Sequence, residues 1–103
     1  MSDQPPVAVR TYWQTCRAAP SQWEGELHDG RMFYVRVRHG RLEVRVSPRP
    51  SADVTDAVRS PAALLVALHD PSESFMDEDT MKDSSAEVLD FAEAIRVNAE
   101  PIA

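Results

Sequence analysis

The chain has 103 residues, 17 acidic and 11 basic side chains, and a formal net charge of −6. This length supports one domain, because two halves of about 50 residues would each be too small for a stable core. The single Cys excludes an internal disulfide and a multi-cysteine zinc site. The longest apolar run, Ala62 to Leu68, is far shorter than the ~20 residues that a membrane span needs. We therefore expect no membrane partner.

The charge is unevenly distributed along the chain. Residues 1–50 hold eight Arg against five acids, a net charge of +3, whereas residues 51–103 hold three bases against twelve acids, a net charge of −9. The first residues, Met-Ser-Asp-Gln-Pro-Pro, lack the basic start and apolar stretch of a secretory signal. Together with the single Cys, this leads us to expect a cytoplasmic protein.

The first half of the chain predicts an antiparallel sheet. We expect residues 1–6 to form a flexible tail and residues 7–103 a single α+β domain, with a sheet in 7–46 and a helical half in 51–97. A strand is predicted over Val7 to Cys16, which is rich in Val, Thr, Tyr and Trp. Residues 22–46 alternate between apolar and polar side chains and contain turn signals at Asp29-Gly30 and His39-Gly40. This pattern predicts a three-stranded meander, or a four-stranded sheet with the first strand added.

Alternation along these strands separates two faces. The apolar face, which must be covered, is predicted to hold Trp23, Leu27, Phe33, Val35, Val37, Leu42, Val44 and Val46. The opposite face is predicted to be solvated, with Glu24, Glu26, Met32, Tyr34, Arg36, Arg38, Arg41, Glu43 and Arg45.

The second half contains several helix-start signals. Ser51 is a candidate cap for a short helix through Arg59, and Asp70-Pro71-Ser72-Glu73 has the form of a capping box. Ser84-Ser85-Ala86-Glu87 also has this form and predicts a helix through Val97. The apolar stretch from Ala62 is a buried helix or a central strand, because periodicity does not decide the matter in so short a run. The helices are predicted to cover the apolar face of the sheet, which gives two layers.

The chain lacks the motifs that usually mark catalysis or cofactor binding. It has no Gly-rich phosphate loop, no Gly-x-Ser-x-Gly elbow and no His-Glu-x-x-His. The acidic stretch from Asp77 does not match a calcium-binding loop, because Lys82 stands where Gly is expected. We therefore expect no catalytic residue, no cofactor and no metal site. A small enzyme is the alternative, and it would need a pocket lined by Cys16, a His and a carboxylate.

The acidic half suggests a protein-binding function. A small acidic protein can block a basic, nucleic-acid-binding partner by occupying its phosphate channel, as inhibitors and immunity proteins do. The residues predicted to make this contact are Asp77, Glu78, Asp79 and Asp83.

The polar face of the sheet suggests a different function. Arg and aromatic side chains on an open sheet bind phosphates and stack on bases. The residues predicted to form such a nucleic-acid-binding face are Tyr34, Arg36, Arg38 and Arg45. The sequence leaves open whether the acidic half folds over this face and neutralises it. It also leaves the oligomeric state open.

Residues 20–46 carry a resemblance. The segments Ser21-Gln22-Trp23-Glu24-Gly25, Asp29-Gly30-Arg31 and Tyr34-Val35-Arg36-Val37-Arg38-His39-Gly40-Arg41-Leu42 resemble those of small proteins encoded by phages and their bacterial hosts. Val37 and His39 depart from that pattern, because aromatic residues are expected at both positions. The resemblance implies a phage or bacterial source and brings no activity with it.

Overall fold

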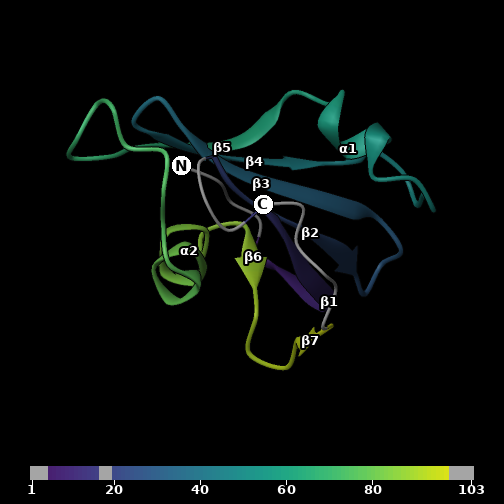
Figure 1. The fold of residues 1–103 in the computed structure, drawn as a ribbon. Coiled ribbons are helices and arrows are strands. Elements are labelled where there is room, and N and C mark those ends of the chain that lie inside the picture. The colour runs from purple at the N-terminus through teal and green to yellow at the C-terminus, as the bar shows by residue number, and fades with distance from the viewer. Residues whose placement is uncertain (1–4, 17–19, 98–103) are drawn as a thin grey trace.

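A sheet of seven strands dominates the computed structural model, which describes residues 5–16 and 20–97 (Figure 1). Of the predicted tail, residues 1–4 lie outside the described residues. The four strands of the first half are β1 (Val7–Cys16), β2 (Ser21–Leu27), β3 (Met32–Arg38) and β4 (Arg41–Val46). They pair antiparallel in chain order, so the predicted meander and its added first strand are confirmed.

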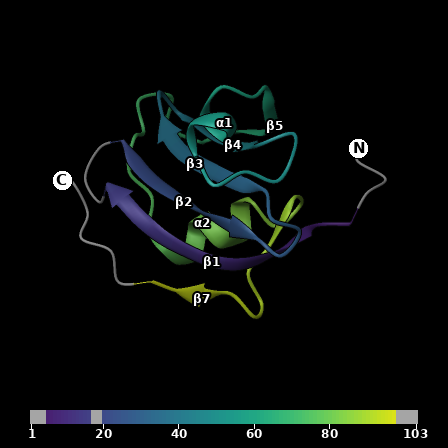
Figure 2. The ribbon, with the colours of Figure 1, turned by 90° about the vertical axis from the view of Figure 1, so that its right-hand side faces the viewer.

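The second half adds three strands and two helices. Its elements are α1 (Thr55–Val58), β5 (Ala62–Ala67), α2 (Glu78–Ser84), β6 (Leu89–Asp90) and β7 (Ile95–Arg96). Strand β5 extends the sheet beyond β4, whereas β6 and β7 both pair parallel with β1 at the other end. Figure 2 shows β7 running beside β1.

The sequence left the stretch from Ala62 open between a buried helix and a central strand. Residues 62–67 form a strand that pairs antiparallel with β4 and lies at the edge of the sheet, not at its centre. The predicted helix of residues 84–97 is absent, and this segment forms turns and the short strands β6 and β7. Ser85 ends α2, where its hydroxyl donates to the carbonyl oxygen of Met81 at 2.8 Å. The molecule is thus a small domain with a mostly antiparallel sheet and few helices.

The predicted apolar face is confirmed as the core. Seven of its eight predicted residues are buried, and Val46 packs against them at the margin. Helix α2 covers this inner face through Met81, and the following segment adds Leu89 and Phe91. The Phe91 ring meets Tyr12 edge-on at 5.1 Å between centroids and Phe33 at 6.0 Å. Phe91 therefore joins the residues of β1 and β3 on the inner face.

The opposite, outer face is less open than predicted. Met32 and Tyr34, which alternation predicts to be solvated, are each only 7% exposed. Ala57 of α1 packs on both of them, with Val54 and Trp13 at the margin. Helices α1 and α2 therefore lie on opposite faces of the sheet (Figure 1).

The turn between β3 and β4 holds the long loop that follows β5. His39 and Gly40 have φ values of 53° and 72°, the left-handed pair that suits a two-residue hairpin. The Gly40 N–H donates to the carbonyl oxygen of Glu73 at 2.8 Å, and a Cβ at Gly40 would lie 2.5 Å from Cα of Pro71. The loop after β5 therefore packs directly on the hairpin. In the described residues, no helix is long and apolar enough to cross a membrane.

Replacing Gly25 by Ala tests the packing of the inner face. A Cβ at Gly25 would lie 2.3 Å from the carbonyl oxygen of Thr11 and 2.7 Å from the Phe33 ring. We expect a loss of about 1–3 kcal/mol in the free energy of unfolding, as for other overpacked cores. Thermal unfolding followed by circular dichroism measures this loss. The control is Glu26→Ala in the same strand, with an expected change within about 0.5 kcal/mol. Equal melting temperatures for the two variants would contradict this packing.

Candidate anion-binding face

Four arginines gather around one glutamate on the outer face. We define the Arg patch as the shallow cavity of about 230 Å³ that β3, β4 and their turn form. Its lining residues are Arg36, Arg38, His39, Arg41, Glu43 and Arg45. Cross-strand register explains the cluster, because Arg36 lies opposite Glu43 and Arg38 lies opposite Arg41.

Glu43 holds two of these arginines in place. Its Oε1 accepts from Nε of Arg36 at 3.3 Å and lies 3.2 Å from Nη2 of the same residue. Its Oε2 accepts from Nη2 of Arg45 at 3.1 Å. Nη1 of Arg45 also donates to the carbonyl oxygen of Ser60. One carboxylate therefore orients two guanidinium groups and leaves the patch with excess positive charge.

Arg38 and Arg41 are the available cations of the Arg patch. Both side chains are exposed, and they lie directly across from each other beside the turn. Within the described part of the chain, neither forms an ion pair. Like charges placed directly opposite on a sheet repel. An anion bound between them would relieve this repulsion, so the pair is suited to phosphate or carboxylate.

Tyr34 lies beneath the patch and does not project from it. Burial raises the pKa of the Tyr34 phenol, and the Arg36 guanidinium lies 5.9 Å from its ring centroid. Tyr34 therefore supports Arg36 from below and is not free to stack on a base. The structure thus brings together three of the four predicted residues, Arg36, Arg38 and Arg45, with the fourth covered.

The acidic residues of α2 have different roles. Asp77 caps the helix, because its carboxylate accepts from the Thr80 hydroxyl at 2.7 Å and from the Thr80 N–H at 3.1 Å. These two hydrogen bonds lower the pKa of Asp77. Asp79 and Asp83 are exposed. Of the four predicted acidic residues, only these two are free of such structural hydrogen bonds among the described residues.

The partly buried carboxylate of Glu78 accepts hydrogen bonds from other parts of the molecule. Its Oε2 accepts from the Tyr12 hydroxyl at 2.9 Å, and its Oε1 accepts from Nε1 of Trp23 at 3.4 Å. Nε of Arg96 donates to both carboxylate oxygens, at 3.0 and 3.1 Å. Glu78 thus ties α2 to β1, β2 and β7, and this role explains why it is not free to bind a partner.

The surroundings of Glu78 lower its pKa. Partial burial acts to raise the pKa of Glu78, but hydrogen bonds from Tyr12 and Arg96 and the charge of Arg96 outweigh it. A hydrogen bond with Tyr12 raises the pKa of the neighbouring Lys82. Because the pKa of Glu78 is lower in the folded state, its stabilisation is complete above the ordinary value of 4.5 and is lost as the pH falls.

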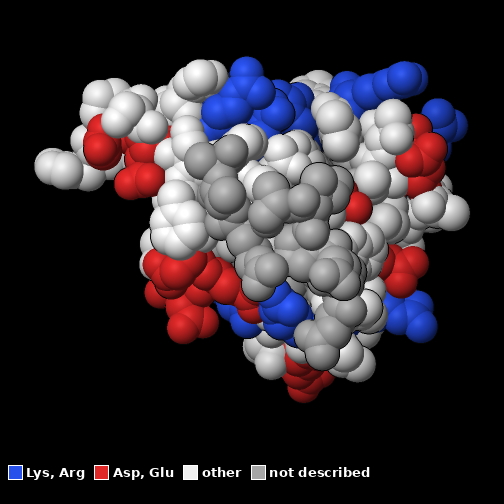
Figure 3. Space-filling model, in the orientation of Figure 1, with Lys and Arg blue, Asp and Glu red and all other residues white. Residues whose placement is uncertain are grey.

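The Arg patch and the acidic residues of α2 lie on opposite sides of the sheet. In Figure 3 a group of Lys and Arg side chains lies along the top of the view, on the side of the sheet that carries α1. A group of Asp and Glu side chains lies at the lower left, where Figure 1 shows α2. The acidic helix α2 therefore packs on the inner face, whereas α1 covers Met32 and Tyr34 on the outer face beside the Arg patch. No acidic side chain of the second half lines the Arg patch among the described residues.

The described residues contain no group of three or more His, Cys, Asp or Glu side chains placed to hold a metal ion. His28, His39 and His69 are all exposed. Cys16 lies in β1 and lines none of the three cavities described for this part of the chain.

The predicted site missed three members of the Arg patch, His39, Arg41 and Glu43. The signal for Arg41 was present, because alternation puts it on the polar face, and a two-residue turn puts it opposite Arg38. The internal role of Glu78 had no sequence signal, since its hydrogen-bond partners Tyr12, Trp23 and Arg96 are 18 to 66 residues away.

Comparison with known proteins adds no relative: no family model, no curated protein and no solved structure matches this chain. The resemblance of residues 20–46 to phage and bacterial proteins therefore stays a prediction.

Replacing Glu78 by Gln tests the internal role of this carboxylate. At pH 7 we expect the variant to lose about 1.5–3 kcal/mol in the free energy of unfolding, the usual contribution of hydrogen bonds to charged groups. The difference between variant and wild type should shrink as the pH falls below 4.5, the ordinary value for this carboxyl. Urea unfolding followed by Trp fluorescence at pH 7 and at lower pH measures both effects. Asp79→Asn is the control, and a pH-independent difference would contradict the role of Glu78.

Proposed function

We propose that this protein is a non-enzymatic binding protein whose Arg patch binds single-stranded nucleic acid. The observation that carries this proposal is the uncovered cluster of Arg36, Arg38, Arg41 and Arg45 on the face opposite the acidic helix. Guanidinium groups match the geometry of phosphate and bind it through two parallel hydrogen bonds. The overall charge of −6 does not oppose this contact strongly, because the acids of α2 lie on the other side of the sheet and salt screens them.

The arrangement favours the phosphate backbone over base recognition. Tyr34, the aromatic side chain predicted for base stacking, is buried under α1. Arg38 and Arg41 remain exposed and unpaired by acids among the described residues. We therefore expect binding that depends on salt and depends little on sequence, as for other contacts made through phosphates.

The test is the affinity of the protein for a fluorescently labelled single-stranded oligonucleotide over a range of salt concentrations. We expect the double variant Arg38→Gln/Arg41→Gln to bind more weakly and to reduce the slope of log affinity against log salt by about 1.4, at ~0.7 for each lost phosphate contact. Arg10→Glu is the matched control, because it changes the net charge by the same amount from β1. Wild-type protein that does not shift the oligonucleotide at low salt would refute the proposal.

A second candidate function is the binding of a basic protein through the acidic side. A cavity of about 450 Å³ near the start of α2 favours it, with Asp70, Glu73 and Asp77 beside Leu68 and Phe75. Such a mixture suits the apolar stem and charged head of a Lys or Arg from a partner. Asp79 and Asp83 continue the acidic surface along α2. An inhibitor or immunity-type protein, encoded by a phage or bacterium, would use this side.

Charge reversal separates this candidate from the first. The double variant Asp79→Lys/Asp83→Lys leaves Glu78 and the cap Asp77 intact, so we expect it to fold normally. If the acidic side binds a basic partner, the variant should recover less of that partner than the wild type does from a host lysate. Its binding to the labelled oligonucleotide should not weaken. If the variant and the wild type recover the same proteins in equal amounts, the acidic side does not bind a partner.

A further inference from the structure

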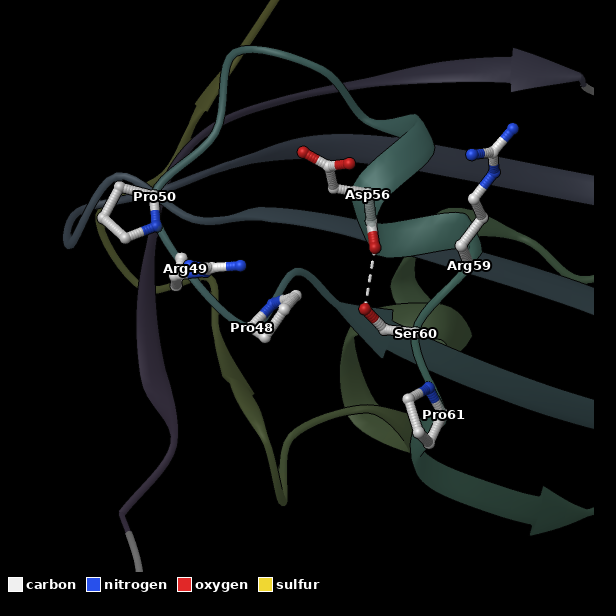
Figure 4. Close-up of a pocket in the computed structure, with 7 residues that line it drawn as sticks. All are labelled: Pro48, Arg49, Pro50, Asp56, Arg59, Ser60 and Pro61. Carbon is white, nitrogen blue, oxygen red and sulfur yellow. Dashed lines mark hydrogen bonds between the residues drawn. The ribbon is translucent and has the colours of Figure 1, made fainter.

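A third cavity lies at the end of β4, on the far side of Arg45 from the turn. Its volume is about 650 Å³, within the range of small-molecule sites. Figure 4 shows its two walls, one from the segment that follows β4 and one from α1 and the residues that precede β5. The lining residues are Pro48, Arg49, Pro50, Asp56, Arg59, Ser60 and Pro61.

Hydrogen bonds hold both walls in place. The buried Ser47 hydroxyl accepts from the Met32 N–H at 2.9 Å and donates to the carbonyl oxygen of Arg49 at 2.9 Å. On the other wall the Ser60 hydroxyl donates to the carbonyl oxygen of Asp56 at 2.7 Å, as the dashed line in Figure 4 marks. These hydrogen bonds fix the backbone of both walls.

The pocket combines rigid apolar walls with cations. Pro48, Pro50 and Pro61 supply ring surfaces, and Figure 4 shows Arg49 between Pro48 and Pro50, with Pro61 on the other wall. Arg59 is exposed at the rim, and within the described residues neither Arg49 nor Arg59 forms an ion pair. The Asp56 carboxylate is occupied, because it accepts from the Ser51 hydroxyl at 2.6 Å.

Arg45 connects this pocket to the Arg patch. Its guanidinium lines the patch, bonds to Glu43 there, and donates to the carbonyl oxygen of Ser60 in the pocket wall. The Arg patch and the pocket therefore adjoin at Arg45, and the acidic side chains that line them are Glu43 and Asp56.

We propose that this pocket holds one nucleotide of the strand that the Arg patch binds, with its phosphate on Arg49 and Arg59 and its base against the proline rings. This inference rests on the proposed function and adds a defined subsite to it. The pocket is large enough for a base and its phosphate, whereas an acidic side chain would fill only a small part of it. Guanidinium groups also stack on base faces, which gives Arg49 a second role.

The experiment measures salt-dependent oligonucleotide binding by the double variant Arg49→Gln/Arg59→Gln. We expect the slope of log affinity against log salt to fall by about 0.7, as for the loss of the one phosphate that both arginines hold. The variant Arg49→Lys/Arg59→Lys keeps the charges and should keep the slope while its affinity falls. Arg10→Glu again serves as the control, and circular dichroism verifies that each variant is folded.

A titration of the wild type with uridine monophosphate provides the second readout. We expect changes in the NMR shifts of the Arg49, Arg59 and Ser60 amides, and none of these in the Gln variant. Suppose that the oligonucleotide binds, and that the Gln variant has the same salt slope and the same uridine monophosphate shifts as the wild type. The pocket is then not a subsite, and the proposed function still stands. If the wild type binds no oligonucleotide, the proposed function fails and this inference fails with it. Binding of poly-glutamate in place of the oligonucleotide would also overturn both.

Discussion

The inner face of the sheet must be covered, and the way it is covered determines the rest of the structure. Trp23, Phe33 and Val35 present a continuous apolar surface that a single sheet leaves open to water. Met81 of α2 and Phe91 close this surface from one side. Because α2 also carries the acidic residues, covering the core moves negative charge to the inner side and leaves the arginines of the outer face uncovered.

Glu78 fixes the position of α2. It is the one acidic residue of this helix that reaches Tyr12 and Trp23, and Arg96 closes the group from β7. A helix of seven residues has little stability of its own, so these contacts and the burial of Met81 hold it. The separation of charge between the two faces therefore depends on an ion pair and hydrogen bonds near the core, and not on the net charge of either half of the chain.

Most of the sheet could be predicted from the sequence, because alternation and turn chemistry are local signals. The positions of Val35, Val37 and Val44 follow from period two, and the His39-Gly40 turn sets their register. The edge strand β5 could not be predicted, since Ala62–Ala67 is apolar on both faces and no periodicity distinguishes it from a helix. The segment after Ser84 has a capping pattern, but contacts of Phe91 with the sheet override it.

The candidate site was predictable only in part, because alternation is a local signal and says nothing of tertiary contacts. Alternation assigns Arg36, Arg38 and Arg45 to one face, and they do lie together. It gives Tyr34 the same assignment, but α1 covers that side chain through a tertiary contact with Ala57. The pocket beyond Arg45 has no sequence signature, because Arg49 and Arg59 are brought together by the return of the chain from α1 to β5.

The central claim is that an uncovered Arg face binds nucleic acid while the acidic face does not. Mapping amide chemical-shift changes on addition of a single-stranded oligonucleotide tests it most directly. The account predicts changes over residues 36–45 and at Arg49 and Arg59, with none over Glu78–Ser84. Changes confined to α2, or an unchanged spectrum at low salt, would contradict it.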